Sequence, residues 1–243
     1  MKLSGLLDLG SNYNYEEFQQ KLNEWIIENG WEFKNVGGIP IPDPSLNEIQ
    51  SVSSAAVFHP KYNKDTEQKE WNKRYFLSRT WDPGLPILTA FMMNPSHANE
   101  YSGDDTVDFM VQYAKHNGFG ALFVINTSTV IKPTGTKKED FPIETENHKY
   151  IEFAVENADT VVLGWGGNGQ KFGIPNLISK QFFLKLMREN HVKLNVLGYG
   201  NINKSKIFPR HPYPRMKKQR FTLDSPLIKV SDEQWAKLFR NTP

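Results

Sequence analysis

Two asparagines and one histidine stand where their residue types could support chemistry on a polar substrate. Asn94 follows a nearly continuous apolar run, and Pro95 keeps it out of the helical region, so its amide is held at the mouth of a predicted strand. Asn126 follows a second apolar run, and an amide that donates and accepts at once suits the edge of a nucleobase. His211 lies in a rigid loop between two prolines. Each asparagine is equally typical of an ordinary turn, so both interpretations stay open for these motifs.

A basic segment surrounds this histidine. No acidic residue lies between Glu189 and Asp224, and aromatic residues are interleaved with the cations there, although the net charge of the whole chain is only +2. Such a strip is typical of a surface that binds a phosphate backbone, while a solvated basic face has the same composition. The residues that we assign to DNA binding are Lys204, Lys206, Arg210, Tyr213, Arg215, Lys217 and Lys218.

Two further motifs have a functional and a structural interpretation. Residues 164–169 satisfy G-x-G-x-x-G after a predicted strand, but no acidic residue ends the next strand, which argues against a dinucleotide site. Asp104 and Asp105 precede a predicted helix, where a carboxylate is typical of an N-terminal cap; one of the pair could face the cleft, and we assign Asp105 to it. No histidine has a spacing typical of metal ligands, so we expect neither a metal nor a cofactor.

Composition excludes several classes of protein. The 243 residues include no cysteine, which rules out disulfide scaffolds, thiolate nucleophiles and the zinc deaminases of nucleobases. Hydrophobic residues make up 38% of the chain, enough for a sizeable core. No apolar run approaches the roughly 20 residues that span a bilayer, and the N-terminus lacks the shape of a signal peptide. We therefore expect a cytoplasmic protein with no membrane partner.

Strands and helices alternate from residue 85 onward. Apolar runs predict strands at 85–93, 121–126, 159–164 and 192–197. Amphipathic segments predict helices at 105–117, 146–157 and 178–190. This order predicts a three-layer α/β/α domain around a central, mainly parallel four-stranded sheet. Ligands of such sheets bind beyond the carboxyl ends of the strands, which is where Asn94 and Asn126 fall.

The first seventy residues have a different pattern. A helix is predicted at 16–28, and two strands at 51–58 and 74–81 are predicted to form a hairpin or an edge pair. We therefore expect residues 1–73 to be an N-terminal helical and hairpin extension packed on the core, and residues 74–243 to be the α/β domain.

Taken together, the strand-end motifs resemble the uracil-DNA glycosylase superfamily. Its members carry Asp-Pro or Asn-Pro after the first strand, Asn-Thr after the second, often Trp-Gly after a later strand, and a His-Pro loop near the end. This chain has, in that order, Asn94-Pro95-Ser96, Asn126-Thr127, Trp165-Gly166 and His211-Pro212. More closely, roughly residues 74–230 are similar to a family of bacterial and phage proteins that is catalogued only as a domain of unknown function, number 1643.

The resemblance implies a role for each matching residue. Asn94 would hold a water beneath the sugar carbon, Asn126 would read a flipped base, and His211 would donate to the departing base. Arg215 falls at the position of the side chain that fills the gap left by the flipped nucleotide. Tyr101 or Trp165 would stack on the base. The substrate-binding residues implied in this way are Pro95, Ser96, Tyr101, Asn126, Thr127, Trp165 and Gly166.

The implied function is a monofunctional DNA glycosylase that acts as a monomer on duplex or single-stranded DNA. Because the amide of Asn94 cannot act as a general base, and Tyr213 replaces a small serine, we expect a modified or damaged base rather than plain uracil. The biological role would be repair, or defence against phages with modified genomes. Two other functions stay open, namely a non-catalytic module that binds nucleic acid or modified bases, and a hydrolase of free modified nucleotides.

Overall fold

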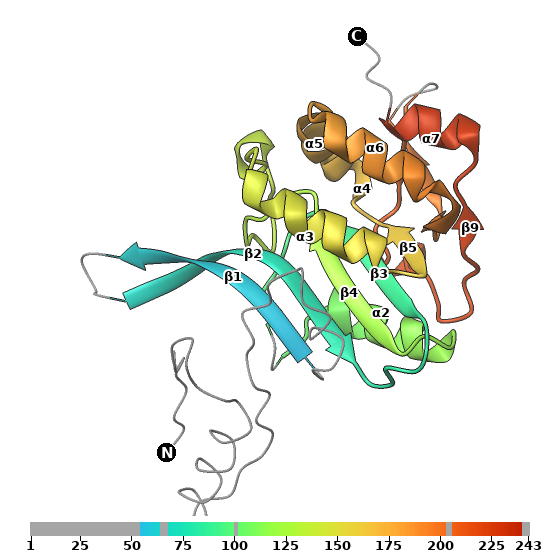
Figure 1. Cartoon of the computed structure of the whole chain (residues 1–243), viewed down its shortest axis with the longest axis horizontal. Helices are drawn as coiled ribbons and strands as arrows, with labels where there is room; N and C mark the ends of the chain where they lie inside the picture. Colours follow the sequence, from blue (N-terminus) through green and yellow to red (C-terminus); the bar gives the residue numbers. More distant parts are fainter. Residues whose placement is uncertain (1–53, 64–67, 100–101, 203–205, 240–243) are drawn as a thin grey trace, which may run out of the picture. The chain divides into compact units, whose positions relative to one another are not determined.

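The structure is a computed structural model that describes residues 54–63, 68–99, 102–202 and 206–239 (Figure 1). The predicted helix 16–28 lies outside the described residues. The predicted hairpin is confirmed, because β1 (Ser54–Asn63) pairs antiparallel with β2 (Gln68–Thr80). β2 also pairs with β4 (Ala121–Asn126), so the hairpin extends the main sheet. The expected boundary after residue 73 therefore falls inside a strand.

Seven strands form one mixed sheet in the order β1-β2-β4-β3-β5-β6-β9. The remaining strands of this sheet are β3 (Ile87–Met92), β5 (Thr160–Leu163), β6 (Leu194–Val196) and β9 (Ile228–Lys229). β4, β3, β5 and β6 run parallel to one another, as the alternating pattern predicts. The expected sheet of four strands is too small. β2 pairs antiparallel with β4 at one side of the parallel strands, and β9 pairs antiparallel with β6 at the other.

Helices cover both faces of this sheet, which gives three layers. α2 (Asp105–His116) packs on one face, where Met110 and Tyr113 share a hydrophobic cluster with Leu88 and Leu122. The helices on the other face include α3 (Thr145–Glu156), α6 (Gln181–Glu189) and α7 (Asp232–Phe239) (Figure 1). The predicted α/β class and the helices 105–117, 146–157 and 178–190 are confirmed to within a few residues at their ends.

The buried strands explain why their sequences read as continuous apolar runs. Side chains alternate between the faces of a strand, so Leu88, Ala90 and Met92 of β3 pack toward α2, while Phe91 packs toward the other layer. Since helices cover both layers, β3 is buried from Leu88 to Met92 and β4 along its whole length.

The glycine-rich segment after β5 is helical and not a loop. It forms α4 (Gly166–Asn168), a π-helical turn (Gly169–Gly173) and α5 (Ile174–Ile178). Gly166 has a φ of 67°, a conformation that glycine adopts without a steric penalty, and it turns the chain sharply from β5 into the helix.

The chain passes from β3 to β4 on one side of it and then crosses back from β4 to β5 on its other side, so the direction of the connections reverses at β3. The carboxyl end of β3 is therefore the point at which this kind of sheet forms its ligand crevice. A small second sheet, β7 (Tyr199–Asn201) and β8 (Ile207–Pro209), leads the chain to His211. Short 3-10 turns lie at Lys138–Asp140, His191–Lys193 and Lys217–Gln219.

Candidate active site

Asn126 ends β4 with its side chain enclosed by protein. The residue is 1% exposed, and neither its Nδ2 nor its Oδ1 has a hydrogen-bond partner among the described residues. Its main-chain carbonyl accepts a hydrogen bond of 3.2 Å from Nδ2 of Asn147 on α3, which fixes the backbone at this strand end. A buried polar group without partners costs about 1–3 kcal/mol, and both atoms of this amide are available to a molecule that reaches the strand end.

Asn94 lies near Asn126, because Met92, two positions earlier, pairs with Asn126 in the parallel register. Nδ2 of Asn94 donates to the carbonyl of Pro95 at 3.0 Å and to the carbonyl of Lys132 at 2.6 Å. The main chain thus binds both amide hydrogens, and Oδ1 is the atom left to accept a hydrogen bond from another molecule. Asn94 can therefore be a turn residue and a functional residue at once. Its Nδ2 holds the loop, and its Oδ1 is a fixed hydrogen-bond acceptor.

The loop that carries His211 packs on the carboxyl ends of β3 and β5. A Cβ atom added to Gly164 would lie 2.8 Å from Cδ of Pro212 and 3.2 Å from Sδ of Met92. A Cβ atom added to Gly166 would lie 3.9 Å from Cβ of His211. His211 is therefore adjacent to the first turn after β5, at the same edge of the sheet as the two asparagines.

Burial and hydrogen bonding determine the state of the His211 imidazole. The main-chain N–H of Tyr213 donates to Nδ1 at 3.2 Å, so the neutral ring carries its hydrogen on Nε2. Burial lowers the pKa of His211 below its ordinary value, and the nearby charge of Asp104 opposes this effect only in part. At neutral pH the ring is thus an uncharged donor through Nε2.

Asp104, and not Asp105, is the carboxylate associated with this histidine. Oδ1 of Asp104 accepts the main-chain N–H groups of Thr106 at 3.0 Å and Val107 at 2.9 Å, which confirms the predicted cap of α2. The charge of Asp104 also acts on His211. Asp105 is exposed in the first turn of α2. The capping Asp104 is thus the carboxylate whose charge acts on His211, and the assignment of Asp105 to the cleft stays a prediction.

Arg74 on β2 is a buried charge that no sequence motif indicated. It is 2% exposed, Nη1 donates to the carbonyl of Ala98 at 2.6 Å, and Nε has no partner in the described part of the chain. Burial lowers the pKa of Arg74 to about 10, and the charge of Asp104 opposes that shift. The arginine thus fastens the loop between β3 and α2 next to the site. The signal in the sequence that could have indicated this residue is an arginine directly before the aromatic and apolar residues 75–77 of the predicted strand 74–81.

Two residues assigned to the substrate pocket are buried and hydrogen-bonded within the protein. Trp165 is fully buried in the core, and its Nε1 donates to Oε1 of Gln170 at 2.9 Å. Its ring has no face free to stack on a base, so the prediction of stacking by Trp165 is not supported. Thr127 is also buried, and its Oγ1 donates to the carbonyl of Met93 at 2.8 Å, which joins the ends of β4 and β3.

The other predicted pocket residues that the structure describes lie in the chain directly after β3 and β5. Pro95 is buried and Ser96 is half-buried, directly after Asn94. Gly166 lies beside His211, as described above. Tyr101 lies outside the described residues, so its stacking on a base stays a prediction.

The predicted basic strip divides into two groups. Arg210 donates to the carbonyl of Gln219 at 2.5 Å, and its guanidinium carbon lies 4.6 Å from the ring centroid of Phe221. Arg220 donates to Oη of Tyr213 at 2.6 Å and stacks on that ring at 3.8 Å. These residues brace the loop around His211. The exposed cations are Lys206, Arg215, Lys217 and Lys218, and Lys204 lies outside the described residues.

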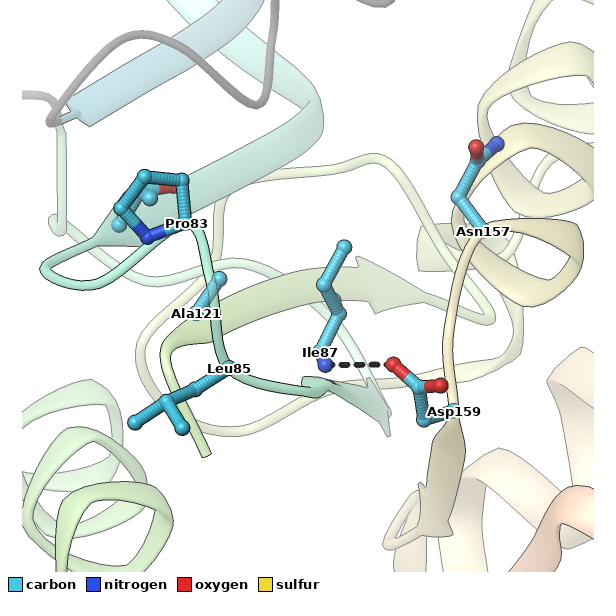
Figure 2. Close-up of a pocket in the computed structure, with 7 residues that line it drawn as sticks. Pro83, Leu85, Ile87, Ala121, Asn157 and Asp159 are labelled. Carbon is cyan, nitrogen blue, oxygen red and sulfur yellow. Dashed lines mark hydrogen bonds between the residues drawn. The ribbon is translucent and has the colours of Figure 1, made fainter. Parts of the chain in front are cut away.

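A cavity of about 240 Å³ lies at the opposite end of the sheet (Figure 2). Its lining includes Leu85, Ala121 and Asp159, which stand at the amino ends of the central strands. Figure 2 shows the carboxylate of Asp159 directed at the main chain of Ile87, whose N–H donates to Oδ2 at 2.8 Å. Because ligands of parallel α/β sheets bind at the carboxyl ends, we do not assign the functional site to this cavity.

The described part of the chain has neither a membrane-spanning helix nor a cluster of metal ligands. None of its helices is both long and apolar enough to cross a membrane. Its histidine, aspartate and glutamate side chains form no group of three or more that could hold a metal ion.

Comparison with known proteins finds a match to one family model. That model, of a family described as "Protein of unknown function (DUF1643)", matches residues 74–213. The matched segment begins at the buried Arg74 and ends two residues after His211, so it contains Asn94 and Asn126 as well. Neither the curated proteins nor the solved structures contain a match.

Proposed function

Because the chain belongs to the DUF1643 family, whose description states no activity, we propose a function from the candidate site itself: a monofunctional DNA glycosylase. The enzyme flips a modified or damaged base, a pyrimidine by the resemblance of its motifs, and hydrolyses the bond between base and sugar to leave an abasic site. In this proposal β4, β3, β5 and β6 correspond to the sheet of the uracil-DNA glycosylase superfamily.

The observation that carries the proposal is the unpartnered amide of Asn126. Folding places this side chain at the strand end with both of its polar atoms buried and unbonded. A residue that served only the turn would bond to the backbone around it, as Asn94 does through Nδ2. An amide that offers one donor and one acceptor matches the pairing edge of a pyrimidine base.

The chemistry is a dissociative cleavage of the glycosidic bond. The bond between C1′ and the base nitrogen breaks to give a cationic sugar and an anionic base. Nε2 of His211 donates a hydrogen bond to an oxygen of that base, worth on the order of 3 kcal/mol by analogy with oxyanion sites. Oδ1 of Asn94 accepts a hydrogen bond from a water held beneath C1′. The water oxygen then bonds to C1′ while its proton passes through solvent to the base.

The DNA contacts follow from the position of the exposed cations. A base inside a duplex cannot reach Asn126, so it must leave the stack at a cost of a few kcal/mol. Arg215, Lys217 and Lys218 are exposed just after the His211 loop, where they contact phosphates beside the flipped nucleotide.

A modified or damaged base is preferred over plain uracil for a chemical reason. The amide of Asn94 cannot take a proton from water, so the reaction favours a base that leaves easily. Tyr213, held by Arg220 at 2.6 Å, occupies the place of a small serine and changes the phosphate contact there. Repair, or defence against phages whose DNA carries modified bases, is the biological role that fits such a substrate.

A glycosylase screen with matched variants tests the proposal. DNAs that carry uracil, mismatched thymine, or hydroxymethylated or glucosylated pyrimidines are incubated with the protein and treated with alkali, which cuts abasic sites. We expect one of these DNAs to be cut by the wild type, and Asn126→Ala to cut it at least about 100-fold more slowly. Because the buried amide is unpaired and no described protein group bonds to it, its removal should not lower the free energy of unfolding in the way that the loss of a hydrogen-bonded buried side chain does.

Asn195→Ala is the control for this variant. Asn195 is also a buried strand residue, but its Nδ2 donates to the carbonyl of Lys193 at 2.7 Å. Its loss should therefore lower the free energy of unfolding by about 1 kcal/mol and leave excision intact. If no DNA is cut while DNA binding persists, the non-catalytic binding module is the better function. Cleavage of free modified nucleotides at a rate independent of salt would favour the nucleotide hydrolase.

A further inference from the structure

The loop of residues 131–138, called the rim loop below, is fastened to the candidate active site. The main-chain N–H of Lys132 donates to the carbonyl of Pro95 at 3.1 Å, and the carbonyl of Lys132 accepts from Nδ2 of Asn94 at 2.6 Å. Further along the loop, Oγ1 of Thr136 accepts from Nδ2 of Asn168 at 3.3 Å. These bonds give the rim loop a defined position relative to Asn94.

The rim loop also meets the exposed cations that follow His211. Nη2 of Arg215 donates to the carbonyl of Pro133 at 3.4 Å. Lys137 and Lys138 end the rim loop, and both are exposed. Together with the lysines that follow Arg215, they make a basic border from two segments that are far apart in the sequence.

The acidic groups next to the rim loop leave much of this charge available. The carboxylate of Asp140 accepts from Nζ of Lys132 at 2.6 Å and from the main-chain N–H of Lys137 at 2.7 Å, and these two bonds lower its pKa. Oε1 of Glu139 lies 3.9 Å from Nζ of Lys137, a pair too exposed to bind strongly. Lys138 has no ion pair with any described residue.

The tip of the rim loop is open to a large partner. Pro133 and Thr134 are exposed, and Gly135 follows them with a φ of 68°. A Cβ atom added to Gly135 would have no other atom within 4 Å, so the backbone there stands clear of the rest of the protein. A strand of nucleic acid can therefore approach the main chain closely.

We propose that the rim loop is a second DNA-binding segment. Lys137 and Lys138, together with Arg215 and the lysines after it, contact phosphates beside the flipped nucleotide. The inference rests on the glycosylase function proposed above. Because the carbonyl of Lys132 holds Asn94, a strand bound by the rim loop is set in register with the residue that positions the water.

The salt dependence of DNA binding tests this proposal. The dissociation constant of an undamaged 20-base-pair duplex is measured from about 50 to about 200 mM salt for the wild type and for K137A/K138A. Each lost phosphate contact should lower the slope of log affinity against log salt by about one, and the double variant should bind roughly tenfold more weakly at low salt. K185A/K237A is the control, since it removes the same charge from exposed positions on α6 and α7.

The possible outcomes distinguish a failure of the rim-loop proposal from a failure of the glycosylase proposal. A slope that falls in K137A/K138A and not in K185A/K237A supports the rim loop as a binding segment. Equal slopes for both double variants and the wild type would overturn the rim loop and leave the glycosylase proposal standing. Wild-type binding that is absent or independent of salt would overturn both proposals.

Discussion

The two hydrogens that Asn94 donates make an amide preferable to a carboxylate at this position. Asn94→Asp would turn a negative charge toward the carbonyl oxygens of Pro95 and Lys132, which lie 3.0 and 2.6 Å from Nδ2. We expect the variant to lose about 1–3 kcal/mol of unfolding free energy and to gain no excision rate, although aspartate could serve as a general base. Denaturant unfolding and single-turnover excision measure the two effects.

Asn168→Asp is a suitable comparison for that variant. Asn168 is exposed, and its contacts with the carbonyl and Oγ1 of Thr136 are long, at 3.4 and 3.3 Å. Its change should shift the free energy of unfolding by no more than about 0.5 kcal/mol. If Asn94→Asp were as stable as the wild type and excised faster, the amide would not be needed to hold the main chain.

His211 should make both activity and stability depend on pH on the acid side. Burial lowers its pKa, so the folded protein keeps the ring neutral at pH values where the unfolded chain, with a pKa near 6.5, begins to take up a proton. We expect a constant excision rate above about pH 6.5 and a fall as the pH drops through the lowered pKa. The stability that the neutral ring contributes is present above the unfolded pKa and is lost over the same range.

Single-turnover rates and thermal unfolding, each measured from pH 5 to 8, check this prediction. His211→Ala should remove the acid-side loss of stability, whereas His97→Ala, at an exposed position, should retain it. An excision rate that rises as the pH falls would show that the charged imidazole is the active form.

At the scale of elements, the site depends on how closely the His211 loop packs on β5. Gly164→Ala would place Cβ 2.8 Å from Cδ of Pro212, closer than carbon atoms approach without a shift of the loop. We expect the variant to lose about 1–3 kcal/mol of stability and at least tenfold in excision, because His211 moves with Pro212. Gly167→Ala meets its nearest atom, in Phe208, at 3.8 Å and should change neither quantity much. A normal excision rate in Gly164→Ala would show that excision does not depend on the position of His211.

The helices and strands that could be predicted are those whose pattern of apolar residues follows directly from which of their faces are buried. Residues 121–126 read as a strand because they form a short continuous apolar run, and residues 105–117 read as a helix because their apolar residues recur with the helical period. Residues 166–178 could not be read as helical, since glycines disfavour a helix unless tertiary packing stabilises it. The two-residue strand β9 is too short to have a pattern at all.

The candidate site was predictable where it follows strand ends and not elsewhere. Asn94 and Asn126 come together because parallel strands bring their carboxyl ends to one edge. The sequence does not show which of two adjacent carboxylates caps a helix, and it does not show that Trp165, set among glycines, lies in the core. Nor does it separate cations that stack on aromatic rings, such as Arg210, from cations that face solvent.

At the scale of the whole molecule, the core extends beyond the segment that the family model matches. The match ends at residue 213, but α7 contributes Trp235, Leu238 and Phe239 to the larger hydrophobic cluster. The ring centroid of Phe239 lies 5.9 Å from that of Trp165, which directly precedes the turn at Gly166. The C-terminal helix therefore supports the strand end on which the His211 loop packs.

Phe239→Ala should accordingly weaken the whole fold. Loss of a phenylalanine that is 1% exposed costs about 3–5 kcal/mol, a large part of the 5–15 kcal/mol that stabilises a typical protein. We expect a clear drop in the denaturation midpoint, and a loss of excision at temperatures where the wild type is still active. Lys237→Ala removes a surface pair with Glu233 on the same helix and should cost less than about 1 kcal/mol. If Phe239→Ala unfolded at the wild-type midpoint, α7 would be an appendage, and residues 74–213 would hold the site without it.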